Sequence, residues 1–359
     1  MDEILLSVII PAYNCDKYIV DTVQSVIRQP GRGLECIVVD DGSTDQTARL
    51  IDELEKKYSN VRAYHKPNEG LCRTKNYGLE RAKGKYINFL DSDDVICKNA
   101  YTNELADVLS NGEIDIISPS YIVADHDLKW GNVYWRDDHR YLVADAKGKV
   151  KPIYHDAFSL VKREVIGDVR FNSYSEYYED WVFSAMVVYR ARTILTVKTP
   201  WYIWRMNNKS MSHSYSKDKK NNITHWIGAY VYMMENARNS QEREMAAVSL
   251  LQHSYNYIYY RTAYGYPLNE TLENYNADEN IQLAKSICNR DAMVGLPRYN
   301  LMKANTKLYQ TMVRLDLLKN NVEKLIVSVP LVRKANQRFR LGFRTRLDQY
   351  QYCPVEKTN

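Results

Sequence analysis

Three polar clusters in the N-terminal third of the chain carry side chains that are suited to chemistry. Each follows a short apolar run that is typical of a buried strand. The clusters consist of Pro11, Ala12, Tyr13 and Asn14; of Asp40, Asp41, Gly42 and Ser43; and of Asp91, Ser92, Asp93 and Asp94. Because ligands of open α/β sheets bind beyond the carboxyl ends of the strands, we expect the clusters to form one site. A lone acidic pair at a strand end is usually a helix cap, but three clusters in one sheet weaken that interpretation.

The chemistry that these clusters indicate is the handling of phosphate through a metal ion. Asp91 and Asp93 follow an apolar strand, and their carboxylates are oxygen ligands of the kind that Mg²⁺ or Mn²⁺ prefers. Such an ion acts as a Lewis acid on a departing diphosphate. The first strand is followed by neither a P-loop nor a dinucleotide-binding fingerprint. We therefore expect a metal and basic side chains to hold the phosphates.

Alternating strands and helices must position these clusters. Apolar runs that are typical of strands cover residues 5–10, 35–39, 61–64, 86–90 and 114–118, and segments with helical periodicity lie between them. The β-α-β order predicts an α/β fold with a doubly wound, Rossmann-like, mainly parallel sheet. Ser43, followed three residues later by Gln46, resembles a capping box at the start of the second helix. Residues 125–151 are polar and irregular, and we expect a loop or ribbon there that contributes to specificity.

The C-terminal part of the chain has a helical character. Trp226, Tyr230 and Met233 form a helical stripe, so we expect a catalytic domain over residues 1–217 and a helical domain over residues 218–359. Residues 333–346 contain six Lys or Arg and no acid, interleaved with Phe and Leu. This basic tail predicts a peripheral contact with an anionic membrane. A solvated tail, and a tail that trimerises the protein or binds a polymer, are the alternatives.

Composition and length exclude several classes of protein. With 359 residues, of which 45% are hydrophobic and 26% charged, the chain is long enough for two globular domains and is neither collagenous nor disordered. No apolar run approaches the roughly 18 residues that span a bilayer, and no signal-peptide pattern follows Met1. The six cysteines have no paired spacing, which favours a cytoplasmic protein with reduced thiols. The sequence does not indicate a nucleic-acid partner.

Three motifs carry a resemblance to a known family. Residues 7–14 read Ser-Val-Ile-Ile-Pro-Ala-Tyr-Asn, residues 38–45 read Val-Val-Asp-Asp-Gly-Ser-Thr-Asp, and residues 89–94 read Phe-Leu-Asp-Ser-Asp-Asp. In this order and spacing they resemble family 2 of the inverting glycosyltransferases, which have the GT-A fold. The resemblance covers residues 4–215 and implies an enzyme of bacterial cell-surface polysaccharide synthesis.

The resemblance also implies a nucleotide-sugar site. Its candidate residues are Pro11, Ala12, Tyr13, Asn14, Asp41, Lys75, Asp91, Ser92, Arg205 and Ser210. Tyr13 would stack on the uracil of a UDP-sugar, and Asp41 would accept a hydrogen bond from that base. Asp93 would bind Mn²⁺ or Mg²⁺, and Asp91 would bind the metal or the ribose.

Basic and hydroxyl side chains are expected to complete the diphosphate site. The family usually has Ala-Arg-Asn where this chain has Thr-Lys-Asn at residues 74–76, so Lys75 is the donor-site candidate and Arg73 is its alternative. Arg205 and Ser210 match the late Arg and Ser segment of the family, and both would bind phosphate.

Two acids at the start of a predicted helix are the candidate catalytic residues. Glu179 and Asp180 resemble the Glu-Asp motif of the family, in which the second acid is the base. The helix that they open has an apolar face that includes Val182, Ala185 and Met186. Asp180 would take the proton of the acceptor hydroxyl as its oxygen attacks the anomeric carbon, in a single displacement with inversion. An acidic first turn that stabilises the helix dipole is the alternative interpretation.

The resemblance leaves several functions open. The donor would be a UDP-sugar that carries a hexose or an N-acetylhexosamine, and the acceptor would be a hydroxyl of a cell-envelope glycan or a lipid-linked oligosaccharide. A sugar-phosphate nucleotidyltransferase is one alternative, although such enzymes usually have a Gly-rich loop after the first strand. A non-catalytic, glycosyltransferase-like binding subunit is another, but the intact Asp91, Asp93 and Asp180 argue against it. Whether the chain forms a homo-oligomer is also open.

Overall fold

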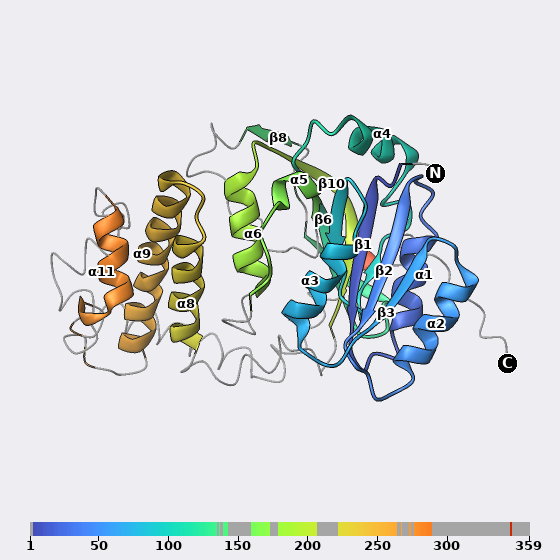
Figure 1. Ribbon diagram of the computed structural model, residues 1–359, viewed down its shortest axis with the longest axis horizontal. Helices are drawn as coiled ribbons and strands as arrows, with labels where there is room; N and C mark the ends of the chain where they lie inside the picture. The colour runs from blue at the N-terminus through green and yellow to red at the C-terminus, as the bar shows by residue number, and fades with distance from the viewer. Residues whose placement is uncertain are drawn as a thin grey trace, which may run out of the picture. The chain divides into compact units, whose positions relative to one another are not determined.

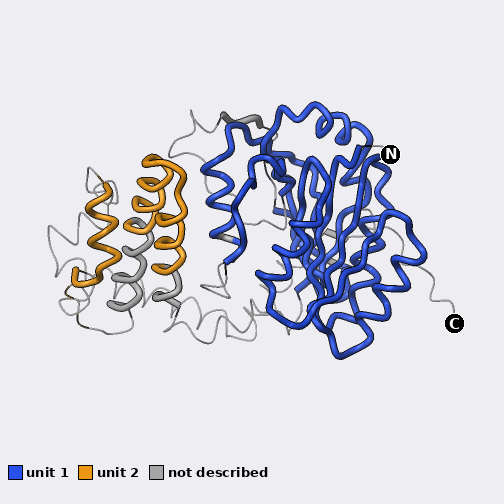
Figure 2. Tube along the Cα trace, in the orientation of Figure 1, with its two compact units in different colours: residues 1–215, 344–359 blue, residues 216–343 orange. Residues whose placement is uncertain are grey.

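The computed structural model describes residues 3–134, 136, 139–142, 159–172, 179–206, 222–263, 267, 273, 276–288 and 345–346. These residues belong to two compact units (Figure 2). The first unit comprises residues 1–215 and 344–359, and the second comprises residues 216–343. All three polar clusters, and the predicted catalytic acids, belong to the first unit.

The N-terminal half of the first unit is a parallel sheet (Figure 1). Its strands are β1 (Leu6–Ala12), β2 (Leu34–Asp40), β3 (Val61–His65) and β4 (Tyr86–Phe89). They lie in the order β4-β1-β2-β3, and every adjacent pair is parallel. Crossover helices connect parallel strands, so the carboxyl ends of β1, β2 and β4 meet at one edge of the sheet. The expected α/β architecture is confirmed.

Further strands extend the sheet beyond β4. They are β5 (Val95–Ile96), β6 (Ile116–Ala124), β7 (Trp130–Tyr134), β8 (His139–Leu142), β9 (Leu160–Lys162), β10 (Thr193–Arg205) and β11 (Thr345–Arg346). Strand β9 pairs antiparallel with β4 and β6, whereas β10 pairs parallel with β6 and antiparallel with β5 and β8. The expected ribbon within residues 125–151 includes β7 and β8. Strand β11 pairs with β7, although the sequence placed its residues in the helical domain.

Helices cover both faces of the parallel half of the sheet. The helices of the first unit are α1 (Ile19–Ile27), α2 (Thr47–Lys57), α3 (Leu71–Arg81), α4 (Asn103–Asn111), α5 (Arg163–Ile166) and α6 (Glu179–Arg190). Helices α1 and α2 lie on one face and α3 lies on the other (Figure 1). Side chains alternate along a strand, so Val8 and Ile10 pack in the same core cluster as Ile19 of α1. Ile9 faces α3 and lies against Gly78 of that helix. A Cβ added to Gly78 would stand 2.4 Å from Cγ2 of Ile9, so the close contact requires a glycine.

Strand β1 is longer than the apolar run predicts, because it continues through Pro11 to Ala12. Proline lacks the N–H that a central strand uses on one of its sides. Strand β4 pairs only with the stretch of β1 from Leu6 to Ile9, so at Pro11 only β2 flanks β1. The proline therefore breaks no ladder on the β4 side.

The predicted capping box at Ser43 and Gln46 is wrong. Gln46 precedes α2 without any side-chain cap. Asp45 takes this role instead, since its Oδ1 accepts a hydrogen bond from the backbone N–H of Thr47 at 2.9 Å. The Ser43 hydroxyl oxygen accepts a hydrogen bond from the backbone N–H of Asn14. Ser43 therefore joins two loops rather than capping a helix.

The described part of the second unit is helical. It contains α8 (Asn222–Glu235), α9 (Ser240–Ala263) and α11 (Glu279–Ile287), and α9 contacts both of the others. Tyr230 and Met233 of the predicted stripe are buried. Among the described residues, no helix combines the length and the apolar character needed to cross a bilayer.

Candidate active site

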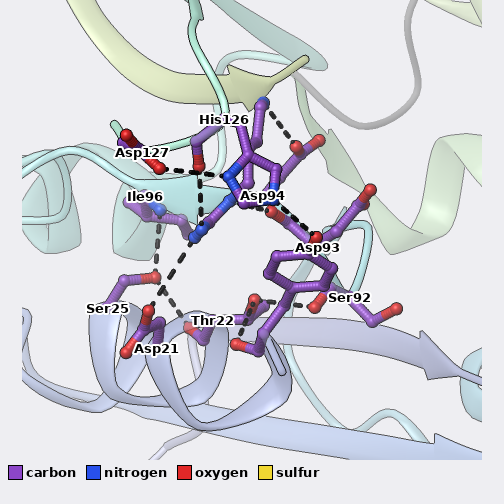
Figure 3. A network of polar contacts seen from close by, with 11 residues as sticks. Asp21, Thr22, Ser25, Ser92, Asp93, Asp94, Ile96, His126 and Asp127 are labelled. Carbon is purple, nitrogen blue, oxygen red and sulfur yellow. Dashed lines mark hydrogen bonds and ion pairs between the residues drawn. The ribbon is translucent and has the colours of Figure 1, made fainter. Parts of the chain in front are cut away.

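The acidic loop, residues 91–94, connects β4 to β5 at the carboxyl edge of the parallel strands. The backbone N–H of Asp94 donates to the carbonyl oxygen of Asp91 at 3.1 Å, which closes a tight turn. The Ser92 carbonyl accepts a hydrogen bond from the Thr22 hydroxyl of α1 at 2.9 Å (Figure 3). Asp91, Ser92 and Asp93 are half-buried, whereas Asp94 is 1% exposed. The loop backbone is thus fixed while Asp91 and Asp93 keep partial access to solvent.

Asp94 holds the acidic loop against β10. Its Oδ2 accepts a hydrogen bond from the Tyr202 hydroxyl at 2.5 Å, and its Oδ1 accepts one from the backbone N–H of Arg205 at 2.7 Å. Burial, followed by the negative charges of Asp93 and Asp91, raises the pKa of Asp94 well above its ordinary value, against the lowering effect of the two hydrogen bonds. No separate role for this buried acid was predicted from the sequence, because its partners lie more than a hundred residues away.

Arg205 lies beside the acidic loop. Its Nε donates to the carbonyl oxygen of Asp93 at 2.8 Å, and its guanidinium lies 4.9 Å from the ring centroid of Tyr18. Its Nη2 stands 3.9 Å from Oδ2 of Asp21, is buried, and has no hydrogen-bond partner among the described residues. Arg205 therefore lies near the predicted metal ligands. Its side chain is held in place by contacts with other residues of the chain.

A tyrosine and a histidine that the sequence analysis missed border the acidic loop. The Tyr18 hydroxyl lies 3.1 Å from Nε2 of His126, and Nδ1 of His126 lies 3.2 Å from Oδ1 of Asp127 (Figure 3). The His126 carbonyl also accepts a hydrogen bond from Nη1 of Arg205, at 3.4 Å. Tyr18 and His126 are 108 positions apart, so no local spacing could reveal the contact.

The cluster that ends β1 combines one exposed ring with a rigid loop. The Tyr13 side chain is 51% exposed, and Ala12 is buried in the strand. Asn14 has a φ of 48°, and its Oδ1 accepts a hydrogen bond from the backbone N–H of Thr44 at 2.8 Å. An asparagine tolerates this left-handed conformation better than most residues do. The arrangement presents the Tyr13 ring for stacking beside the loop that follows β2.

Asp41 is held ionised by donors from the loop that follows β3. Its Oδ1 accepts hydrogen bonds from Nζ of Lys66 and from the backbone N–H of Glu69, and its Oδ2 accepts one from the N–H of Gly70 at 2.9 Å. Burial opposes ionisation, but these hydrogen bonds outweigh it and lower the pKa of Asp41. Gly42, with a φ of +71°, is needed next to it because an added Cβ would stand 2.8 Å from the backbone N of Asn68.

Asp40 is engaged by a histidine that bridges two carboxylates. Nδ1 of His65 lies 3.2 Å from Oδ2 of Asp40, and Nε2 lies 2.9 Å from Oδ1 of Asp52 in α2. Partial burial alone would lower the pKa of His65, but the two carboxylates raise it overall. A ring that donates from both nitrogens is an imidazolium. The bridge therefore ties the ends of β2 and β3 to α2.

Lys75 and Glu179 form an ion pair that joins α3 to the first turn of α6. Nζ of Lys75 lies 3.7 Å from Oε1 of Glu179 and 4.8 Å from the ring centroid of Phe171. Both charged side chains are buried, and Asp180 beside them is half-buried. Glu179 and Asp180 lie in the first described turn of α6, in line with the predicted helix. Ser210 lies outside the described residues.

The carboxylates of Asp91 and Asp93 suit a hard divalent ion whose coordination sphere phosphate oxygens would complete. Among the described residues, no group of three or more His, Cys, Asp or Glu side chains forms a ready-made metal site. Mg²⁺ and similar ions are commonly held by one or two carboxylates together with substrate phosphates, and do not require a cage made only of protein groups. Half-buried Asp91 and Asp93 fit that donor set.

Comparison with known proteins settles the family. The family model described as Glycosyl transferase family 2 matches residues 7–170. An uncharacterised glycosyltransferase of Haemophilus influenzae is 31% identical over 187 residues, which cover 51% of this chain and 71% of the relative. This chain belongs to glycosyltransferase family 2. This chain is also 27% identical to the glycosyltransferase GlyG of Streptococcus pneumoniae over 222 residues, which cover 58% of this chain and 72% of GlyG.

A solved structure shares the fold of this family 2 glycosyltransferase. The S. aureus TarS 1–349 complex with UDP-GlcNAc superposes with a TM-score of 0.57 and 18% sequence identity, covering 98% of this chain and 93% of the TarS chain. TarS is a GT-A glycosyltransferase, so the expected GT-A fold is confirmed. The predictions that the chain is an enzyme, and that it is a glycosyltransferase, are confirmed as well.

Proposed function

We propose that this family 2 glycosyltransferase moves a hexose or an N-acetylhexosamine from a UDP-sugar to a hydroxyl of a cell-envelope glycan or a lipid-linked oligosaccharide. The observation that carries the proposal is the acidic loop, where a rigid backbone presents half-buried Asp91 and Asp93 at the carboxyl edge of the sheet. TarS, which shares the fold, has been solved with UDP-GlcNAc, and this supports the choice of a UDP-sugar donor.

The uridine end of the donor would lie at the ends of β1 and β2. The exposed ring of Tyr13 would stack on the uracil, flanked by Pro11, Ala12 and Asn14. Asp41 would accept a hydrogen bond from the base, a task for which its lowered pKa keeps it ionised. Its bonds to Lys66 and the following backbone fix the direction in which the carboxylate points.

The diphosphate would lie over the acidic loop. Asp93 and Asp91 would hold Mn²⁺ or Mg²⁺, and Ser92 lies between them. When bound, the ion offsets the negative charge that develops on the departing UDP. Lys75, Arg205 and Ser210 would add positive charge and hydrogen-bond donors around the phosphates.

Asp180 would be the catalytic base. It lies in the first turn of α6, next to Glu179, whose carboxylate pairs with Lys75. The acceptor hydroxyl would give its proton to the Asp180 carboxylate while its oxygen forms a bond to the anomeric carbon. The bond from that carbon to the UDP oxygen breaks in the same step, so the anomeric configuration inverts.

The proposal includes a peripheral contact of the basic tail, residues 333–346, with an anionic membrane on its cytoplasmic face. The support is the charge pattern of the tail, which lies outside the described residues except for Thr345 and Arg346. Replacing its Lys and Arg side chains by Gln should release the protein from anionic vesicles. Unchanged vesicle binding would exclude this part of the proposal.

The experiment that tests the function is a thermal-shift panel of UDP-, GDP-, CMP- and dTDP-sugars, each with and without Mn²⁺. A ligand that binds only the native state raises the melting temperature by mass action. We expect stabilisation by a UDP-sugar that depends on the metal. Stabilisation by none of the sugars would favour a non-catalytic binding subunit instead.

The base assignment has its own test. The Asp180→Asn variant should bind UDP with Mn²⁺ as the wild type does, but its transfer rate should fall by about a thousandfold, because a positioned general base contributes that order of rate. Transfer kinetics and UDP titration measure the two effects separately. Near-normal turnover in this variant would remove Asp180 from the mechanism.

A further inference from the structure

Asp94 lies within the acidic loop but uses its carboxyl group for a different purpose from its neighbours. It is 1% exposed, whereas Asp91 and Asp93 are half-buried. Its backbone N–H closes the turn onto the Asp91 carbonyl at 3.1 Å. Both oxygens of its carboxyl group accept hydrogen bonds from β10, one from the Tyr202 hydroxyl and one from the backbone N–H of Arg205. Asp94 therefore connects the turn to the end of a strand far away in the sequence.

The end of β10 is itself held by several elements. Ile203 pairs with Val95 of β5, and Arg205 pairs with Ala124 of β6. The backbone N–H of Met206 donates to the carbonyl oxygen of Ala124 at 2.9 Å. The two donors to Asp94, the Tyr202 hydroxyl and the Arg205 N–H, therefore belong to a strand that is hydrogen-bonded to its neighbours.

A second contact returns from β10 to the acidic loop. Nε of Arg205 donates to the Asp93 carbonyl at 2.8 Å, and the Tyr18 ring packs against the same guanidinium. Asp94 thus holds the backbone of Arg205, and the side chain of Arg205 holds the backbone of Asp93. A displacement of Asp94 would move the Asp93 peptide and the Arg205 side chain together.

We infer that Asp94 is a positioning residue, with the Tyr202 hydroxyl as its partner, that sets the orientation of Asp93 and Arg205 toward a nucleoside diphosphate. The inference rests on the proposed function, because the positioned groups are those assigned to the metal and the phosphates. Asp94 would not touch the donor; it would act through the turn that presents Asp93.

The test measures UDP binding in saturating Mn²⁺ for the wild type and for Tyr202→Phe, which removes only the hydroxyl that Asp94 accepts from. The matched control is Tyr101→Phe, since Tyr101 is another buried tyrosine, whose hydroxyl donates to the Arg32 carbonyl at 2.7 Å. We expect Tyr202→Phe to weaken UDP binding by about tenfold, the size of one lost buried hydrogen bond, while Tyr101→Phe binds as the wild type does.

A second readout needs no metal. In the metal-free protein, amide hydrogen exchange at Arg205 should be faster in Asp94→Ala than in the wild type, and Asp94→Asn should restore much of the protection because its amide oxygen can still accept from that N–H. Protection at Arg205 that is equal in Asp94→Ala and the wild type would overturn the inference.

The outcomes of the binding test separate the inference from the proposed function. If the wild type binds UDP and Tyr202→Phe binds it equally well, the positioning role is wrong and the proposed function stands. If both tyrosine variants lose binding equally, the loss is general and the inference is also wrong. If the wild type binds no UDP, the proposed function fails and the inference fails with it.

Discussion

The acidic loop and the acidic pair formed by Asp40 and Asp41 look alike in the sequence, since each begins with an aspartate that follows an apolar run and contains at least one more aspartate. In the structure they differ in their partners. The acidic pair accepts hydrogen bonds from His65, from Lys66 and from backbone N–H groups, which are cations or fixed dipoles. Among the described residues, Asp94 of the acidic loop accepts hydrogen bonds from a tyrosine hydroxyl and one backbone N–H, and it lies beside two more acids.

The pKa values move in opposite directions for this reason. Burial raises the pKa of both Asp41 and Asp94, but hydrogen bonds led by that from Lys66 bring the pKa of Asp41 below its ordinary value. For Asp94, the charges of Asp93 and Asp91 raise the pKa further, and its two hydrogen bonds do not outweigh them. Lys66 and backbone N–H groups thus stabilise the charge of Asp41, whereas the acidic loop gathers three carboxyl groups, of which those of Asp91 and Asp93 are half-buried. Carboxyl groups at the carboxyl edge of a sheet suit a divalent cation that arrives with a phosphate ligand.

The largest effect that separates the two clusters should come from Asp93→Asn. We expect transfer to fall by about a thousandfold, because a divalent ion contributes several kcal/mol of charge stabilisation, with little change in the melting temperature. Transfer kinetics at several Mn²⁺ concentrations measure this effect. Asp107→Asn is the control, since Asp107 is an exposed acid paired with Arg32. Equal activity in the two variants would contradict a metal role for the acidic loop.

The next effect concerns stability and should come from Asp41→Asn. Lys66 is 6% exposed in its side chain, so Asp41→Asn removes one of the two carboxylates that pair with a buried ammonium and leaves it with Glu69 and the Pro67 carbonyl. We expect a loss of about 2 kcal/mol in the free energy of unfolding at neutral pH, measured in urea. The folded pKa of Asp41 is depressed, so its contribution is present above the ordinary value of 3.8 and is lost as the pH falls through the folded pKa. A difference between variant and wild type that does not shrink in acid would contradict the account.

The smallest effect should come from His65→Gln, which breaks the bridge between Asp40 and Asp52. Because the folded pKa of His65 is raised, its contribution is fully present below the ordinary value of 6.5 and is lost as the pH rises through the folded pKa. The side chain is 41% exposed, so solvent screening keeps the effect small, at about 2 °C in melting temperature. The melting temperature of the wild type should exceed that of the variant by more at pH 5.5 than at pH 8.5. A difference that does not change with pH would show that the charge of His65 contributes no stability.

Local pattern was sufficient to predict most of the first unit. Apolar runs marked β1, β2, β3 and β4, and the acidic start of α6 at Glu179 was visible from the sequence alone. The residue at which a strand ends depends on the strands that pair with it. Strand β1 continues through Pro11 because β4 pairs with it only as far as Ile9, and the sequence does not reveal this pairing. The helix cap depended on loop geometry, because Asp45 accepts the hydrogen bond from the start of α2 and the expected cap, Ser43, accepts one from Asn14 instead.

The candidate site was predictable in its residue types but not in its partners. Asp93 and Asp41 were recognisable from motif and position, whereas the contacts of Asp94 with Tyr202 and of Tyr18 with His126 join segments more than a hundred positions apart. Lys75 was expected to face the donor, and its ion pair with Glu179 was not foreseen. Such pairs arise from how α3, α6 and β10 pack, and no periodicity in a single segment carries that information.

We propose that the acidic loop, and not the acidic pair, carries the metal-dependent recognition of phosphate. The most direct measurement is calorimetric titration of uridine, and of UDP with Mn²⁺, into the wild type, Asp93→Asn and Asp41→Asn. We expect Asp93→Asn to keep uridine binding but to lose the gain in UDP affinity that Mn²⁺ provides, whereas Asp41→Asn should lose uridine binding. An Asp93→Asn variant in which Mn²⁺ strengthens UDP binding as much as in the wild type would contradict it.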